Sequence, residues 1–157
     1  MVALDFELTP LDGESRSLSE WLTTFPLVPI VLDPYTHESA WILDTARRVL
    51  TSYKGADCRP CWIVAASADD AKQFLGPYAD EFLTFADPDK AAIKGWGIES
   101  APAFALVWQD GNIMAKAEGW DPETWREVAE AIDDQTKWIR PQLPAPGDPA
   151  PFAGTAL

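Results

Sequence analysis

The sequence predicts an α/β sandwich in which a mixed central β-sheet lies between flanking helices. Two observations predict this fold class: apolar strand-like segments alternate with helix-like segments, and a hairpin followed by one amphipathic helix completes the pattern. Right-handed crossovers place the two buried parallel strands at the centre of the sheet. The 157 residues are 47% hydrophobic, which is enough for one domain with a real core.

The first half of the chain is predicted to hold two strands and two helices. In order, we expect a strand over residues 6–8, a turn at 10–13, a helix over 17–22, a strand over 30–32 and a helix from about 38 to 53. Pro29 has no amide hydrogen to donate, so it is expected at the first position of its strand or before it. Trp41 falls on the apolar face of the second helix and is expected in the core.

The second half is predicted to alternate between strands and helices until a final helix. We expect a strand over 61–66, a helix over 68–75, a strand over 82–85, a helix opening at 87–88, a hairpin of strands 103–108 and 113–117, and a helix opening at 121–122. Asp87-Pro88 and Asp121-Pro122 each place a capping residue before a proline at the first helical position. Trp62 and Trp125 are expected in the core.

Charge and composition exclude several classes of partner. The formal net charge of −13 disfavours nucleic acid and anionic membranes, which would repel this surface. The acidity is expected to reflect a solvated surface. The longest uncharged run, residues 21–32, is too short to span a bilayer, and residues 1–7 carry no secretory signal. We therefore expect a cytoplasmic protein whose two cysteines are reduced.

Residues 141–157 form a Pro-rich C-terminal tail after a domain over residues 1–140. The density of proline predicts an extended or disordered segment. Two alternatives remain open for this tail. It is either solvated, or it docks on its own domain or on a partner through Phe152 and Leu157.

Two segments carry a resemblance to a known family. One reads Phe6-Glu-Leu-Thr-Pro-Leu-Asp-Gly13 and is followed by Ser17-Leu-Ser-Glu-Trp21; the other reads Trp96-Gly-Ile98, then Pro102-Ala-Phe-Ala-Leu-Val107 and Asp110-Gly111. In this order they resemble the redoxin group of thioredoxin-fold proteins, which includes thiol-disulfide reductases and AhpC/TSA peroxidases. The resemblance covers roughly residues 5–137. It implies a thioredoxin-like three-layer sandwich and a cis bond between Ala101 and Pro102.

In this family the turn after the first central strand carries the reactive cysteine, whose thiolate the following helix N-terminus favours. Here that turn reads Pro34-Tyr-Thr-His-Glu-Ser-Ala40. The reductase register puts His37 and Ala40 at the two cysteine positions, and the peroxidase register puts Ser39 at the nucleophile. The arginine of the peroxidases is also missing near Ala101. Ordinary peroxidase activity is therefore not expected.

The resemblance implies a redoxin-like protein whose normal catalytic thiol is replaced, and which acts by binding a protein or peptide or by homo-oligomerisation. No metal and no cofactor is implied. The same place follows from fold physics, because ligands bind beyond the carboxyl ends of the parallel strands, here at residues 33–39. The expected binding residues are Tyr35, Thr36, His37, Glu38, Ser39, Trp96, Ala101 and Pro102.

Cys58-Arg-Pro-Cys61 is a literal Cys-x-x-Cys in an unusual place. It precedes the second central strand, so it is expected at the opposite end of the sheet from Thr36 and Ser39, on the order of 15–20 Å away. A disulfide would need a tight turn, in which Pro60 occupies an unfavourable position. We favour a buried Cys61 with a loop Cys58. The rival function is a working thiol-disulfide oxidoreductase that uses this pair as its catalytic residues.

Two further chemistries are weighed against simpler roles. A metal site is disfavoured because two thiols and the lone His37 do not complete four zinc ligands. A relay of Ser39, His37 and Glu38 would suggest hydrolase chemistry. The simpler role, which we favour, is helix capping: Thr36 or Ser39 accepts first-turn amides, and Glu38 lies near the positive end of the helix dipole.

Overall fold

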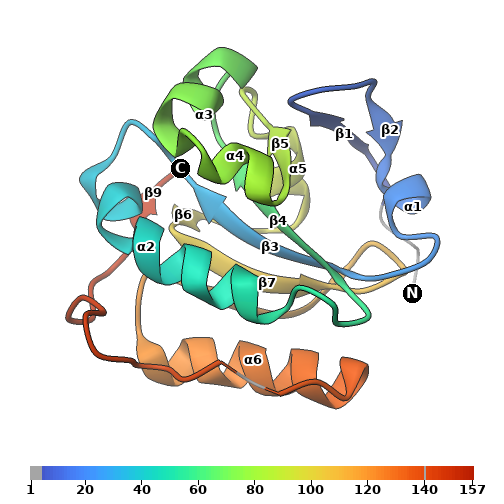
Figure 1. Ribbon diagram of the computed structural model, residues 1–157. Coiled ribbons are helices and arrows are strands. Elements are labelled where there is room, and N and C mark those ends of the chain that lie inside the picture. Colours follow the sequence, from blue (N-terminus) through green and yellow to red (C-terminus); the bar gives the residue numbers. More distant parts are fainter. Residues whose placement is uncertain (1–4, 140) are drawn as a thin grey trace.

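A computed structural model describes residues 5–139 and 141–157, and within them the main sheet has the strand order β2-β1-β5-β4-β3-β7-β8 (Figure 1). The expectation of no secretory signal falls partly on residues 1–4, which lie outside the described residues. The strands are β1 (Glu7–Pro10), β2 (Arg16–Ser17), β3 (Leu27–Leu32), β4 (Arg59–Val64), β5 (Leu83–Ala86), β6 (Ser100–Ala101), β7 (Ala103–Val107), β8 (Ile113–Glu118) and β9 (Thr155–Ala156). The helices are α1 (Leu18–Trp21), α2 (His37–Ser52), α3 (Ala68–Leu75), α4 (Tyr78–Glu81), α5 (Ala91–Gly95) and α6 (Pro122–Thr136).

The centre of the sheet is parallel, as predicted. β3 pairs with β4 and β4 pairs with β5 in parallel, whereas β7 runs antiparallel to β3 and β8 antiparallel to β7. The β7–β8 hairpin follows the Asp-Gly signal, and α6 begins after Asp121, whose side chain accepts the Glu123 amide. The structure confirms both local predictions. They could be made from sequence because turn and cap chemistry acts within a few residues.

Helices cover both faces of the sheet and give the predicted three-layer sandwich (Figure 1). Val28, Ile30 and Leu32 of β3 pack on one face with α2 and α6. Leu27 and Val31 pack on the other face with α1 and α5. Neighbouring residues of β3 serve opposite faces because side chains alternate along a strand. All six residues of β3 are buried, which is typical of a central strand.

Pro29 lies inside β3, so its expected place at or before the start of the strand is wrong. It pairs with Cys61 of β4, while the pairing with β7 passes from Leu27 and Val107 directly to Ile30 and Phe104. The missing amide hydrogen therefore falls where the β7 ladder is interrupted. Burial on both faces of the sheet outweighs the lost ladder bond.

Two other expectations need correction. Asp87 and Pro88 precede a turn, and α5 begins only at Ala91; the Asp87 carboxylate instead accepts the amide of Ile93 at 3.0 Å. Trp41 is 58% exposed, whereas Trp62 and Trp125 are fully buried as predicted. The buried stripe of α2 runs through Ile42, Thr45, Ala46, Val49 and Leu50, so Trp41 lies at its margin.

The tail docks on its own domain in the structure. In Figure 1 it leaves α6, passes the start of α2 and ends beside β6. Leu143 is 4% exposed, Phe152 forms a β-bridge with Trp120, and β9 pairs antiparallel with β6. Of the two alternatives for residues 141–157, the docked arm is therefore the observed one.

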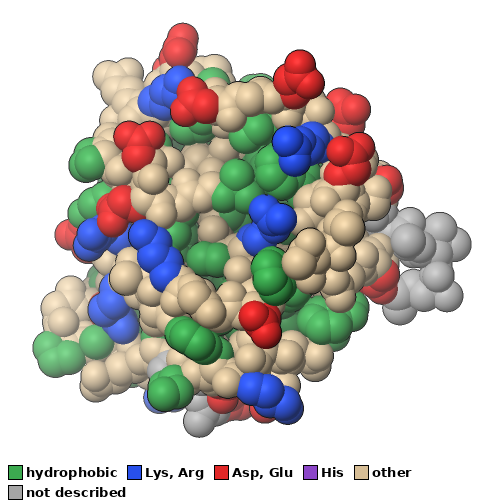
Figure 2. Space-filling model, turned by 45° about the vertical axis from the view of Figure 1, so that its right-hand side comes forward, with side chains coloured by type: hydrophobic (Ala, Val, Ile, Leu, Met, Phe, Trp, Pro, Cys, Tyr) green, Lys and Arg blue, Asp and Glu red, His purple; other side chains and the backbone are tan. Residues whose placement is uncertain are grey.

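The surface carries charges of both signs. On the face in Figure 2, Lys and Arg side chains are interspersed with Asp and Glu. No helix among the described residues has the length and hydropathy needed to cross a membrane.

Candidate functional site

The turn between β3 and α2 is folded around the backbone of Asp33. The Thr36 hydroxyl donates to the Asp33 carbonyl at 2.8 Å, and the Asp33 amide donates to the Ser39 hydroxyl at 2.9 Å. Thr36 occupies the N-cap position without a side-chain cap hydrogen bond. The expected capping by Thr36 or Ser39 is therefore wrong in detail, because both hydroxyls tie the turn back to Asp33 instead.

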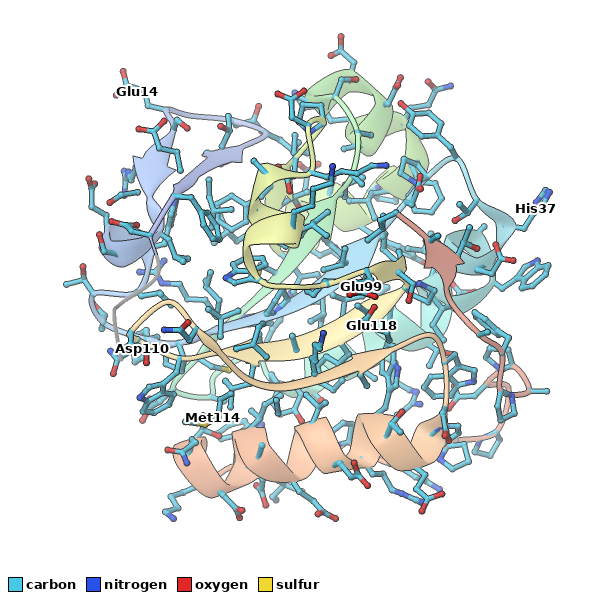
Figure 3. All side chains as sticks on the ribbon, turned by 180° about the vertical axis from the view of Figure 1, so that it is seen from behind. Glu14, His37, Glu99, Asp110, Met114 and Glu118 are labelled. Atoms are coloured by element: carbon cyan, nitrogen blue, oxygen red, sulfur yellow. The ribbon has the colours of Figure 1, made fainter. Side chains whose placement is uncertain are left out.

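The side chains of the imagined Ser-His-Glu relay do not converge. Ser39 is fully buried, and its hydroxyl bonds to the Asp33 amide and to Thr36. The His37 ring stacks on Trp41 at a centroid distance of 6.2 Å, and Figure 3 shows His37 pointing outward. A nucleophile needs hydrogen-bond contact with its base and access to substrate, and this arrangement offers neither.

Tyr35 points away from the start of α2 toward α3. It is 68% exposed, and its hydroxyl donates a hydrogen bond to Asp70. That bond to a carboxylate raises the pKa of Tyr35 above its ordinary value. A shallow pocket lies beside this pair, and it is lined by Pro34, Tyr35, Asp70, Gln73 and Phe74.

Ala101 is the last residue of β6, Pro102 follows it, and the peptide bond between them is cis. Glu118 of β8 fixes the β6 strip, because its carboxylate accepts the amides of Glu99 and Ser100 at 2.9 and 2.8 Å (Figure 3). Burial pushes the pKa of Glu118 upward, but hydrogen bonds from Lys116 and from these amides outweigh it and hold the pKa below its ordinary value.

The end of the tail links this strip to the start of α2. Thr155 pairs with Ala101, and its hydroxyl donates to the Glu38 carboxylate, which lowers the pKa of Glu38. Phe152 contacts Trp41 edge-to-face, at a centroid distance of 5.6 Å. We call the group of Glu38, Trp41, residues 99–101 and Trp120 the edge site. It includes Glu38 and Ala101 of the predicted residues.

Several residues of the edge site were not singled out from sequence. The sequence predicts Trp41 in the core, and it does not single out Glu118 and Thr155, whose side chains contact the edge site. The signal for the docked tail in the sequence is the pair Phe152 and Leu157, apolar residues at the end of a Pro-rich segment.

Trp96 does not join the predicted surface. It is 5% exposed, packs against Phe6, and donates its indole N–H to the Gly111 carbonyl at 3.2 Å. Gly111 belongs to the β7–β8 turn. Because β7 runs antiparallel to β3, that turn lies at the end of the sheet opposite Thr36. The Trp96 indole is therefore a core residue at the opposite pole.

Both cysteines are free and buried. Cys61 is fully buried beside Pro29 in the middle of the β3–β4 ladder, and Cys58 is 7% exposed. Burial is the main cause that raises the pKa of Cys58 to about 12, and it raises the pKa of Cys61 well above its ordinary value. Thiols in such surroundings are poor nucleophiles at neutral pH. Within residues 5–139 and 141–157, no cluster of three or more His, Cys, Asp or Glu side chains is suited to a metal ion.

Comparison with known proteins shows the fold. No family model and no curated protein matches the sequence. Among solved structures, DsbF of Mycobacterium tuberculosis superposes with a TM-score of 0.64 at 20% identity, over 84% of this chain and 99% of that one. Peroxidoxin BcpB of the same organism gives 0.61 at 13% identity, over 90% and 97%. The chain therefore has the thioredoxin fold, shared with thiol-disulfide oxidoreductases.

A third similar structure extends over the tail. A hypothetical protein of Sinorhizobium meliloti superposes with a TM-score of 0.69 at 15% identity, over 99% of this chain and 91% of that one. That span takes in nearly all of residues 141–157.

Proposed function

We propose that this chain is a redoxin-like binding protein in which the catalytic thiol of the thioredoxin fold is replaced. Its ligand is a protein or peptide segment held at the edge site. The observation that carries the proposal is that residues 33–40, the turn before α2 and its first helical turn, contain no cysteine and hold His37, Ser39 and Ala40. Covalent thiol chemistry at the start of α2 has no nucleophile.

The geometry around this turn supports recognition of an extended chain. The β6 strip accepts a paired strand, as its pairing with β9 demonstrates. Glu38 offers a carboxylate acceptor, and Trp41 offers an exposed aromatic face. Backbone pairing supplies affinity and the flanking side chains supply selectivity, which is the general mode of strand addition.

The rival function, a thiol-disulfide oxidoreductase using Cys58 and Cys61, lacks an accessible thiolate. Insulin reduction with dithiothreitol as electron donor tests it. We expect no acceleration over dithiothreitol alone. The matched control is His37→Cys/Ala40→Cys, which restores Cys-x-x-Cys at the start of α2. Activity of the unaltered chain that disappears in Cys58→Ser would overturn the binding proposal.

A further inference from the structure

Residues 152–157 run along the edge site as an added strand. Trp120 and Phe152 exchange two backbone hydrogen bonds, from the Trp120 amide at 2.8 Å and from the Phe152 amide at 2.9 Å. Thr155 then pairs with Ala101. The Leu157 amide donates to the Glu99 carbonyl at 2.9 Å. The segment thus occupies the backbone groups that a bound peptide would use.

The glycine in this segment fits a space that admits no side chain. A Cβ built on Gly154 would lie 2.8 Å from the Ser100 hydroxyl and 3.1 Å from the Ala101 carbonyl oxygen. Gly119 faces the same strand, and its Cβ would lie 2.8 Å from the Gly154 nitrogen. Close approach of two backbones at this point therefore selects for glycine.

The other contacts of the segment are made by side chains of distinct chemistry. The Phe152 ring contacts the Trp41 ring edge-to-face, and the Thr155 hydroxyl donates a hydrogen bond to the Glu38 carboxylate. Leu157 packs against the apolar cluster on the α1 and α5 face. Ala153 and Ala156 are exposed. The edge site therefore contacts an aromatic residue at position 152, a glycine at position 154, a threonine at position 155 and an aliphatic residue at position 157.

The tail is anchored separately, before this segment begins. The Asp148 carboxylate accepts hydrogen bonds from Thr45 at 2.8 Å, from Arg48 at 2.7 Å and from the Ala145 amide at 2.7 Å. Its side chain is only 5% exposed. Pro149 and Pro151 lie between this anchor and the paired segment. Residues 152–157 can therefore leave the edge site while the anchor holds, because β9 is a two-residue strand that pairs with β6 in a two-stranded sheet, and such short ladders open at low free-energy cost.

Building on the proposed function, we propose that residues 152–157 are an internal ligand of the edge site. A partner protein replaces them with an extended segment of the same chemistry: aromatic, any residue, Gly, Thr, any residue, aliphatic. A tethered ligand acts at an effective concentration on the order of millimolar. The intact chain thus binds such a segment weakly until its own strand is displaced.

The test uses the full-length chain with one substitution. Gly154→Val places a side chain against Ser100 and the Ala101 carbonyl and releases the internal strand. Ala153→Val is the matched control, since Ala153 is exposed. Hydrogen exchange at the Leu157 amide is expected to accelerate in Gly154→Val and to stay unchanged in the control.

The probe is a fluorescein-labelled peptide with the sequence of residues 149–157, followed by anisotropy. We expect Gly154→Val to bind it about tenfold or more tightly than the unaltered chain or the control, because the tethered competitor is gone. A peptide with valine in place of glycine should bind none of them. Adding Glu38→Gln to Gly154→Val should weaken binding severalfold.

Equal or absent binding by Gly154→Val and the unaltered chain would overturn the inference. So would a dimer of the unaltered chain that Gly154→Val abolishes, since the strand would then come from a second copy. If Gly154→Val does not fold, millimolar peptide added to the unaltered chain must deprotect the Leu157 amide, or the inference fails. If Gly154→Val does not bind this peptide but binds other peptides, and that binding requires Glu38, the inference about residues 152–157 fails. The proposed binding function then still stands. If the unaltered chain reduces insulin and Cys58→Ser does not, the proposed binding function itself is overturned.

Discussion

Alkylation of Cys58 in the native chain is expected to be far slower than alkylation of an exposed thiol. The matched comparison is Ala40→Cys, which places a thiol at an exposed position in the first turn of α2. Iodoacetamide at pH 8, with peptide mapping by mass spectrometry, follows each cysteine separately. The same chain in urea gives the rate for an unprotected Cys58.

The magnitude follows from the pKa. Burial raises the pKa of Cys58 from 9.0 to about 12, so the thiolate fraction at pH 8 falls about a thousandfold. A more basic thiolate is intrinsically more nucleophilic, and a Brønsted coefficient of about 0.4–0.5 recovers roughly 15- to 30-fold. The net slowing is about fiftyfold for an equally accessible thiol. With Cys58 only 7% exposed, restricted access slows it further.

One result would refute this reasoning. If native Cys58 reacts within about threefold of the unfolded rate, then it is neither protected nor held as a thiol. Cys58 and Cys61 would then again be candidates for nucleophilic catalysis. Fast alkylation of Ala40→Cys alone is the expected outcome, because a helix N-terminus favours the thiolate.

Three other outcomes follow from the packing and charges. Trp125→Ala should lower the free energy of unfolding by about 3–5 kcal/mol and Trp41→Ala by less than about 1 kcal/mol, measured by urea denaturation, because only the first is fully buried. Asp148→Ala should cost about 2 kcal/mol and deprotect the tail amides in hydrogen exchange, whereas Lys72→Ala, which breaks an exposed ion pair, should cost less than about 0.5 kcal/mol. The pKa of Glu38 is lowered in the folded chain, so its contribution to tail docking is full above its unfolded pKa and is lost as the pH falls through the lowered value; tail-amide exchange in Glu38→Gln should lack this acid dependence.

Local chemistry made much of the fold predictable. The Asp-Pro opening of α6, the Asp-Gly turn of the hairpin and the Ser17 cap of α1 each act within a few residues, and each is seen in the structure. The same reasoning failed at Asp87, whose carboxylate also caps a helix but reaches Ile93 across an intervening turn. The capping hydrogen bond itself is predictable from the residue type. The number of residues between the capping side chain and the capped amide depends on the conformation of the intervening loop.

Other features depend on long-range packing and escaped sequence reasoning. Pro29 is tolerated in a central strand because the β7 ladder is interrupted where its amide would donate. Trp96 is held at the opposite pole by Gly111, a partner that only the tertiary fold supplies. The composition of the tail predicts an extended chain equally well whether it docks or not, since docking is decided by Asp148 and by the fit of Gly154.

The start of α2 connects the missing thiol with the docked strand. A helix N-terminus favours negative charge, and in the family that this sequence resembles a thiolate takes advantage of it. Here Glu38 supplies a carboxylate in the first turn of α2, and this carboxylate accepts a hydrogen bond from the Thr155 hydroxyl. A carboxylate at this place is charged at neutral pH without being a redox group, so it accepts hydrogen bonds and transfers no electrons. Under the proposed function, the Glu38 carboxylate keeps a negative charge at the start of α2, and the site serves recognition in place of covalent chemistry.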